Sequence, residues 1–281
     1  MRLANINGVT LRYEVLGASG PWMALSPGGR REMGNVRGLA QRMADAGYRV
    51  LIHDRRNCGA SECAFDGSRS EYEVWADDLV GLLRRLNATP AIVGGGSSGA
   101  RLALLYAQRF PRELRALLLW RITGGAFAAR RLVEQYYDQY VRAAEQGGMA
   151  AVAETEHFRE RILANPRNRQ ILAATDRNAF IAAMKNWRAD FLKDAEMPVI
   201  GASEKALAAI KVPTCLIPGN DRTHSHAIGE AAHRLIPGSE LHDLWPGDLD
   251  IDLFPADEWA AREAAQAGIF ADFLRRRLVA A

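Results

Sequence analysis

Two patterns of apolar residues alternate along the chain: short runs bounded by glycine or proline, and stretches in which apolar residues recur every three or four positions. The runs are typical of strands, and the stretches are typical of helices that cover a sheet. The predicted strands are residues 9–16, 22–26, 49–53, 91–93, 117–120, 214–217 and 241–245, and the predicted helices are residues 71–86, 101–108, 227–235 and 258–274. This alternation predicts an α/β fold with a mostly parallel central sheet and helices on both faces.

The strand pattern is missing from residues 124–210, where only helical periodicity is found. The helical stretches there are residues 130–145, 149–163 and 177–192. We therefore predict a core formed by residues 1–123 and 211–281, with residues 124–210 inserted as a helical cap. The insertion begins where a strand ends, and ligands of open α/β sheets bind at such ends, so we expect the cap to roof a site.

Residues 90–106 predict a strand, a sharp turn of the form Gly-x-Ser-x-Gly and an amphipathic helix. Ser97 is at the tip of the turn, and Gly95 and Gly99 remove the Cβ atoms that would clash there. This pattern is a nucleophile elbow, which exposes a serine hydroxyl. The N–H of Ser98 begins the helix and is a candidate donor to an oxyanion.

Three further segments have recognisable patterns. Residues 25–30 read Leu-Ser-Pro-Gly-Gly-Arg after the second predicted strand, residues 54–61 read Asp-Arg-Arg-Asn-Cys-Gly-Ala-Ser after the next, and residues 212–221 read Val-Pro-Thr-Cys-Leu-Ile-Pro-Gly-Asn-Asp. In this order, and together with the elbow, they resemble the α/β-hydrolase superfamily over essentially the whole chain. The resemblance implies the α/β-hydrolase fold, with an oxyanion loop, an Asp-x-x-Gly-x-Gly-x-Ser turn and an acidic turn in these three segments.

The resemblance also implies roles for single residues. Pro27 has no N–H, so the first donors that the oxyanion loop offers are Gly28 and Gly29, which would act with Ser98. Asp221 stands where the family places its catalytic acid. An aspartate after a strand also forms turns and caps helices, and the two roles are compatible.

No histidine follows His242, although the family takes its catalytic base from the loop after the last strand. In that loop Asp250 takes the place of the histidine, and a carboxylate is a poor base for a serine hydroxyl unless burial raises its pKa. His224 lies three residues after Asp221 and would bridge Asp221 and Ser97 if its loop folded back. The alternative interpretation of His224 is a histidine at the start of a surface helix. The alternative for Asp250 is a residue of an acidic surface loop.

The remaining histidines are interpreted as structural. His53 is expected to be a buried, hydrogen-bonded core residue, His157 part of a solvated helix face, His242 part of a strand, and His226 and His233 part of the helix after Asp221.

Four arginines near these motifs are candidates for binding an anionic substrate: Arg30, Arg31, Arg101 and Arg121. Asp250 is a further candidate for the substrate site, where it would hold a proton, orient a substrate hydroxyl or pair with Arg101. Pairing with surface carboxylates is the alternative for the arginines, and we expect it for at least two of them.

Composition narrows the class of protein. The chain has 281 residues, 48% of them apolar, which is enough for one sizeable core. The net charge of +3 is too balanced to indicate nucleic acid as a partner, and no apolar run is long enough to span a membrane. Three cysteines have no metal-site spacing and favour a reducing cytoplasm. No metal or cofactor is expected, and a homodimer is left open.

These features favour a cofactor-free serine hydrolase that acts on a small ester, lactone, amide or carbon–carbon substrate through Ser97. The missing late histidine motivates two alternatives. One is a non-hydrolytic enzyme of the same fold, a lyase, isomerase or cofactor-independent oxygenase, and the other is a ligand-binding protein without catalysis.

Overall fold

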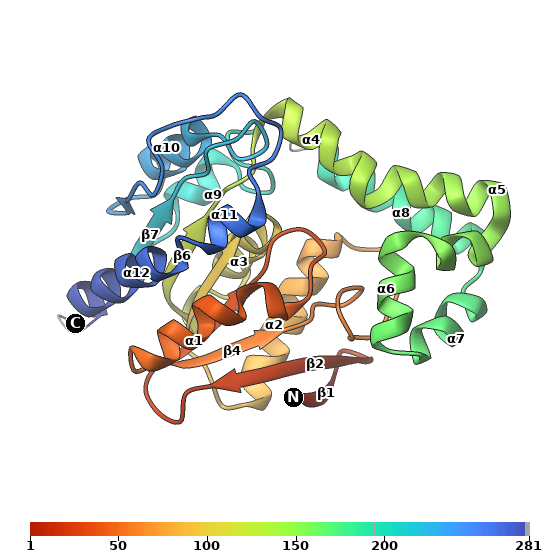
Figure 1. Cartoon of the computed structure of the whole chain (residues 1–281), viewed down its shortest axis with the longest axis horizontal. Helices are drawn as coiled ribbons and strands as arrows, with labels where there is room; N and C mark the ends of the chain where they lie inside the picture. Colours follow the sequence, from red (N-terminus) through yellow and green to blue (C-terminus); the bar gives the residue numbers. More distant parts are fainter. Residues whose placement is uncertain (194, 279–281) are drawn as a thin grey trace.

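The computed structural model describes residues 1–193 and 195–278, which form an eight-stranded sheet flanked by helices (Figure 1). Along the sheet the strands run β1 (Arg2–Ile6), β2 (Val9–Leu16), β4 (Arg49–His53), β3 (Trp22–Ser26), β5 (Ala91–Gly96), β6 (Leu114–Trp120), β7 (Thr214–Ile217) and β8 (Glu240–Leu241). Only the pairings of β2 with β1 and with β4 are antiparallel. The predicted, mostly parallel sheet is confirmed.

Side chains alternate between two hydrophobic cores, one on each face of the sheet. Met23 and Leu25 of β3 face a core that contains residues of α1 (Arg37–Asp45) and α12 (Glu263–Leu278), whereas Ala24 faces the other core. That second core contains residues of two more helices, α2 (Glu71–Arg85) and α3 (Ser98–Arg109). Because successive residues of a strand point to opposite faces, fully apolar strands need helices on both sides, as predicted.

The segment between β6 and β7 contains no long strand in its described part and is built from helices (Figure 1). These are α4 (Gly125–Val133), α5 (Gln139–Glu154), α6 (Glu156–Ala164), α7 (Arg167–Ala174), α8 (Arg177–Leu192) and the short α9 (Glu204–Ala208), with a π-helical turn at Glu134–Asp138 joining α4 to α5. Phe158, Phe180 and Phe191 are buried among them, as expected for aromatic residues that pack helices. We refer to α4–α8 as the helical insertion.

Several predicted boundaries were wrong. The helices predicted at residues 130–145 and 149–163 are interrupted by the π-helical turn and by a break at Thr155, and the helix predicted at 258–274 is split into α11 (Ala256–Ala260) and α12. The strand predicted at 241–245 ends at Leu241, so His242 lies outside it. The short β1 and α1 were not predicted, because polar residues interrupt the apolar ones in both.

Two histidines differ from their expected surroundings. His53 is buried as predicted, but neither of its ring nitrogens has a hydrogen-bond partner among the described residues, and burial lowers its pKa to about 3. His157 is half-buried rather than fully solvated: its Nε2 lies 3.1 Å from the carbonyl oxygen of Asn57, and burial lowers its pKa well below the usual value. Both side chains are therefore neutral in the folded chain near neutral pH.

These neutral histidines predict that acid destabilises the fold. The unfolded chain takes up protons near pH 6.5, whereas the folded chain does not, so stability is full above that pH and is lost as the pH falls below it. For His53 alone the loss is at most about 1.4 kcal/mol per pH unit. We expect His53→Leu to flatten the fall in the free energy of unfolding between pH 7 and pH 5.5, measured by urea denaturation. His242→Gln is the control, and an unchanged slope in His53→Leu would contradict the assignment.

Candidate active site

Ser97 occupies the sharp turn between β5 and α3. Its backbone has φ +53° and ψ −116°, a conformation that residues with a side chain rarely adopt. A Cβ atom on Gly95 would lie 2.2 Å from the backbone of Gly99, and one on Gly99 would lie 2.2 Å from the carbonyl oxygen of Ser26. The turn therefore requires both glycines, and the predicted elbow is present.

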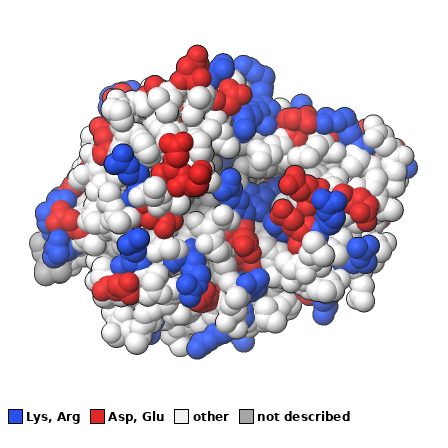
Figure 2. All heavy atoms as spheres, in the orientation of Figure 1, with Lys and Arg blue, Asp and Glu red and all other residues white. Residues whose placement is uncertain are grey.

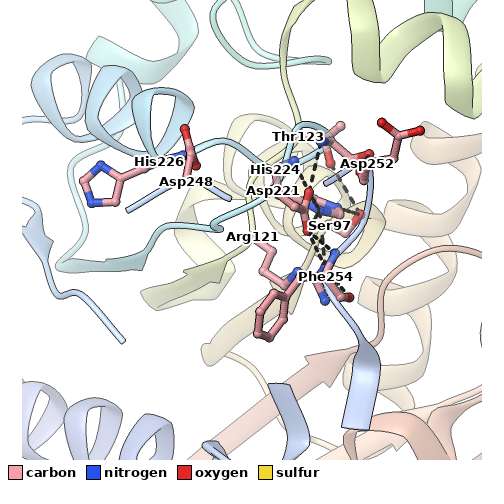
Figure 3. A network of polar contacts seen from close by, with 10 residues as sticks. Ser97, Arg121, Thr123, Asp221, His224, His226, Asp248, Asp252 and Phe254 are labelled. Atoms are coloured by element: carbon pink, nitrogen blue, oxygen red, sulfur yellow. Dashed lines mark hydrogen bonds and ion pairs between the residues drawn. The ribbon is translucent and has the colours of Figure 1, made fainter. Parts of the chain in front are cut away.

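His224 lies beside the hydroxyl of Ser97 (Figure 3). Its Nε2 atom is 2.8 Å from Ser97 Oγ, and its Nδ1 atom is 3.0 Å from Oδ1 of Asp221. An ionised carboxylate only accepts hydrogen bonds, so Nδ1 carries the ring proton and Nε2 is free to accept a proton from Ser97. The structure brings together the three residues that the sequence proposed.

The turn after β7 explains how a histidine so near the acid reaches the serine. Asp221 Oδ1 accepts hydrogen bonds from the backbone N–H groups of Thr223 at 3.0 Å and His224 at 2.8 Å, an Asx turn that folds the loop back. A Cβ atom on Gly219 would lie 2.0 Å from the carbonyl oxygen of His224. The turn-forming and orienting roles of Asp221 therefore coincide.

The loop after β8, residues 246–254, braces this turn instead of supplying a histidine. The N–H of Phe254 donates to Asp221 Oδ2 at 2.9 Å (Figure 3). Thr223 Oγ1 donates to the carbonyl oxygen of Asp252, and two backbone hydrogen bonds of 2.8 and 2.9 Å join the two loops at Leu249 and Ile251. The alignment of Asp250 with a catalytic histidine was wrong, because Asp250 is exposed and does not line the cavity that contains Ser97.

Arg121 places a positive charge beside Asp221 and His224. Its Nη2 atom lies 2.8 Å from Asp221 Oδ2 and 3.5 Å from His224 Nδ1. Burial lowers the pKa of His224, and the hydrogen bond to Asp221 raises it. The charge of Arg121 lowers it again, so that the pKa of His224 is below the ordinary histidine value. Burial alone raises the pKa of Asp221, but the contacts with His224, Phe254 and Arg121 outweigh it and keep this carboxyl ionised.

The loop of Gly28 and Gly29 lies against the elbow. A Cβ atom on Gly28 would lie 3.2 Å from Ser97 Cβ, and Gly29 has φ +49°. Arg55, buried and stacked 4.5 Å from the ring centre of Trp75, donates from Nη2 to the carbonyl oxygen of Gly29 at 2.6 Å. Arg55 thus fixes the peptides of this loop, a role that the sequence analysis missed.

A cavity of about 420 Å³ opens above Ser97. Its walls come from the ends of β5 and β6, the glycine loop, the loop after β8 and the helical insertion. The lining residues that carry polar side chains are Arg31, Asn35, Ser97, Arg121, Arg131, Gln135, Tyr136, Thr223, His224 and Glu263, with Trp120 and Trp259. Another residue missed from the sequence is Thr123, whose Oγ1 lies 3.3 Å from Ser97 Oγ; its place just after β6 was the available signal.

Three of the candidate substrate-binding residues lie elsewhere. Arg30 is buried against Glu71 at 2.9 Å, and Arg101 is buried against the rings of Tyr72 and Phe191. Their pairing with other groups was expected, but at the surface rather than in the interior. Asp250 is exposed, as described above. Of the five candidates, Arg31 and Arg121 line the cavity, and Arg30, Arg101 and Asp250 do not.

Comparisons with known proteins agree with this fold. Residues 21–146 match the family model described as alpha/beta hydrolase fold. An uncharacterized hydrolase of Bacillus subtilis, YraK, is 31% identical over 113 residues, which cover 40% of this chain and 41% of that protein. The match to YraK thus spans less than half of either protein.

Two solved structures match over nearly the whole chain. The enol-lactonase from Burkholderia xenovorans has a TM-score of 0.66 at 21% identity, covering 98% of this chain and 100% of that one. An esterase from Thermogutta terrifontis has a TM-score of 0.67 at 21% identity, covering 98% and 99%. At this identity the two structures show the fold.

The chain has the α/β-hydrolase fold, and the proteins that it resembles include hydrolases. Among the described residues, none of the helices is both long and apolar enough to cross a membrane, and no group of His, Cys, Asp and Glu is arranged to hold a metal ion.

The position of Arg121 predicts the titration of His224. Removing a positive charge next to an imidazole makes its protonation easier, so we expect Arg121→Gln to raise the pKa of His224. The pKa is measured by NMR titration of the histidine ring. Arg222→Gln removes a charge from the same loop without contacting His224 and is the control. A pKa of His224 that falls or stays constant in Arg121→Gln would show that Arg121 does not act on the imidazole.

Proposed function

We propose that the protein is a serine hydrolase in which Ser97 is the nucleophile, His224 the base and Asp221 the residue that orients His224. The observation that carries the proposal is the 2.8 Å distance from His224 Nε2 to Ser97 Oγ, with Nδ1 of the same ring 3.0 Å from Asp221. A serine hydroxyl needs an adjacent base of this kind to act as a nucleophile near neutral pH.

In the first half of the reaction, Ser97 Oγ attacks the substrate carbonyl carbon while its proton passes to His224 Nε2. The carbonyl oxygen becomes an oxyanion, which we assign to the N–H groups of Ser98 and of Gly28 or Gly29. The tetrahedral intermediate then collapses, the bond to the leaving group breaks, and His224 returns the proton to that group. The acyl group remains as an ester on Ser97.

In the second half, His224 removes a proton from a water molecule that attacks the acyl carbon. A second oxyanion forms and collapses, Ser97 Oγ leaves with the proton from His224, and the acid product is released. Because the pKa of His224 is lowered, its base form persists below pH 6.5. We expect the acid limb of the activity profile to lie below that value.

The substrate class that fits this chemistry is a small carboxylic ester or lactone, with amides and carbon–carbon substrates less well supported. The named activities of the structural relatives, an esterase and an enol-lactonase, support it. We assign residues 124–210, which contain the helical insertion, as the cap over a core of residues 1–123 and 211–281, because Arg131 and Leu132 of α4 line the cavity above Ser97.

The reaction needs no cofactor, and we place the protein in the cytoplasm. Cys58, Cys63 and Cys215 are free and buried, which fits a reducing compartment. The non-hydrolytic and ligand-binding alternatives rested on the missing late histidine. That reason no longer applies, because His224 occupies the position beside Ser97.

A fluorophosphonate probe tests the nucleophile and the base together. We expect the wild-type protein to be labelled on Ser97, Ser97→Ala to remain unlabelled, and His224→Gln to be labelled at least about 100-fold more slowly, because the proton acceptor is lost. Labelling is followed by mass spectrometry of the intact chain and its peptides.

Matched controls come from the same loop. Ser225→Ala and His226→Gln remove a serine and a histidine next to the site, and both should be labelled at the wild-type rate. The proposal fails if wild-type protein is not labelled, or if His224→Gln reacts as fast as His226→Gln.

A further inference from the structure

The cavity above Ser97 carries positive charge on two walls. Arg31 follows the glycine loop, and Arg131 belongs to α4 of the helical insertion. Neither side chain has a carboxylate within ion-pair distance among residues 1–193 and 195–278, whereas Arg121, on the cavity floor, is paired with Asp221. Figure 2 shows basic side chains in the hollow at the centre of the molecule.

The one acidic residue that lines the described cavity does not neutralise them. Glu263 lies against α1, where a Cβ atom on Gly38 would be 2.2 Å from its Oε2. Burial raises the pKa of Glu263, and the cation that acts on it is Arg42, not an arginine of the cavity. Arg31 and Arg131 therefore face the cavity with uncompensated charge.

Both cations are close enough to act on the catalytic group. Burial is the main cause of the lowered pKa of Arg121. The pairing with Asp221 raises this pKa, and the charge of Arg31 lowers it. Burial is the largest cause of the low pKa of His224. Asp221 raises this pKa, and the charges of Arg121 and, to a smaller extent, Arg131 lower it. Both arginines also line the cavity that contains Ser97, where an acyl group on this residue would lie.

We propose that the substrate is an ester or lactone whose acyl half carries a second carboxylate, held between Arg31 and Arg131. This inference rests on the proposed function. A guanidinium binds carboxylate through two parallel hydrogen bonds, and two guanidinium groups that line one cavity without a carboxylate partner suit one small anion. The acyl half stays in the cavity through both half-reactions, so a carboxylate there is held throughout the cycle.

The test compares two p-nitrophenyl esters of equal acyl length, the neutral valerate and the anionic half-ester of glutaric acid. We expect kcat/KM of the wild-type protein to be at least about 10-fold higher for the anionic ester, at low ionic strength. Arg31→Gln and Arg131→Gln should each lower kcat/KM for the anionic ester about 10-fold and change that for the neutral ester less than about threefold. Arg2→Gln, at an exposed position on β1, controls for the loss of one charge.

Fluorophosphonate labelling separates the two proposals. Glutarate should protect Ser97 of the wild-type protein from labelling, and the double variant Arg31→Gln with Arg131→Gln should need about 10-fold more glutarate for equal protection. If that variant is labelled normally but anionic and neutral esters lose activity equally, the arginines do not select for a carboxylate, and the carboxylate proposal is overturned while the hydrolase stands. If wild-type Ser97 is not labelled, the proposed function itself fails, and the carboxylate proposal fails with it.

Discussion

The hydrogen bonds that converge on the Asp221 carboxylate hold the site together. This fully buried group accepts from the ring and backbone of His224, from the backbone of Thr223 and Phe254, and from Arg121. A buried carboxylate without such partners would be costly, so the loop has one favourable way to fold. That way places the imidazole 2.8 Å from Ser97 Oγ.

Two loops contribute different parts of this arrangement. The loop after β7 carries both the acid and the histidine, three residues apart, and the loop after β8 contributes backbone hydrogen bonds and the N–H of Phe254. Arg121 opposes the imidazolium form while it helps to hold Asp221 ionised. The histidine is therefore well positioned and ready to accept a proton, at some cost in its basicity.

The sequence predicted the sheet and the elbow well because local rules determine both. The strands at 22–26, 49–53 and 214–217 were predicted to the residue, since each is built on a short apolar run with clear ends. Ser97 followed from the glycines around it. His224 remained one of two alternatives, because whether a loop folds back depends on hydrogen bonds from Thr223 and Phe254 that no local pattern encodes.

The arginines also show that the sequence does not predict where a side chain points. Arg30 and Arg101 were candidates by their closeness in sequence to the motifs, but their side chains point into the interior, against Glu71 and against Tyr72. Arg131 was not a candidate, because its place on the cavity wall depends on how the helical insertion packs over the sheet. Side-chain direction is set by tertiary packing, which one sequence does not reveal.

The central claim is that His224 removes the proton from Ser97. The most direct measurement is the rate constant for modification of Ser97 by a neutral fluorophosphonate as a function of pH, in the wild-type protein and in His224→Gln. The account predicts that the wild-type rate rises with loss of one proton at a pKa below 6.5, and that His224→Gln lacks this rise. The same rise at the same pH in His224→Gln would contradict it, because another group would then be the base.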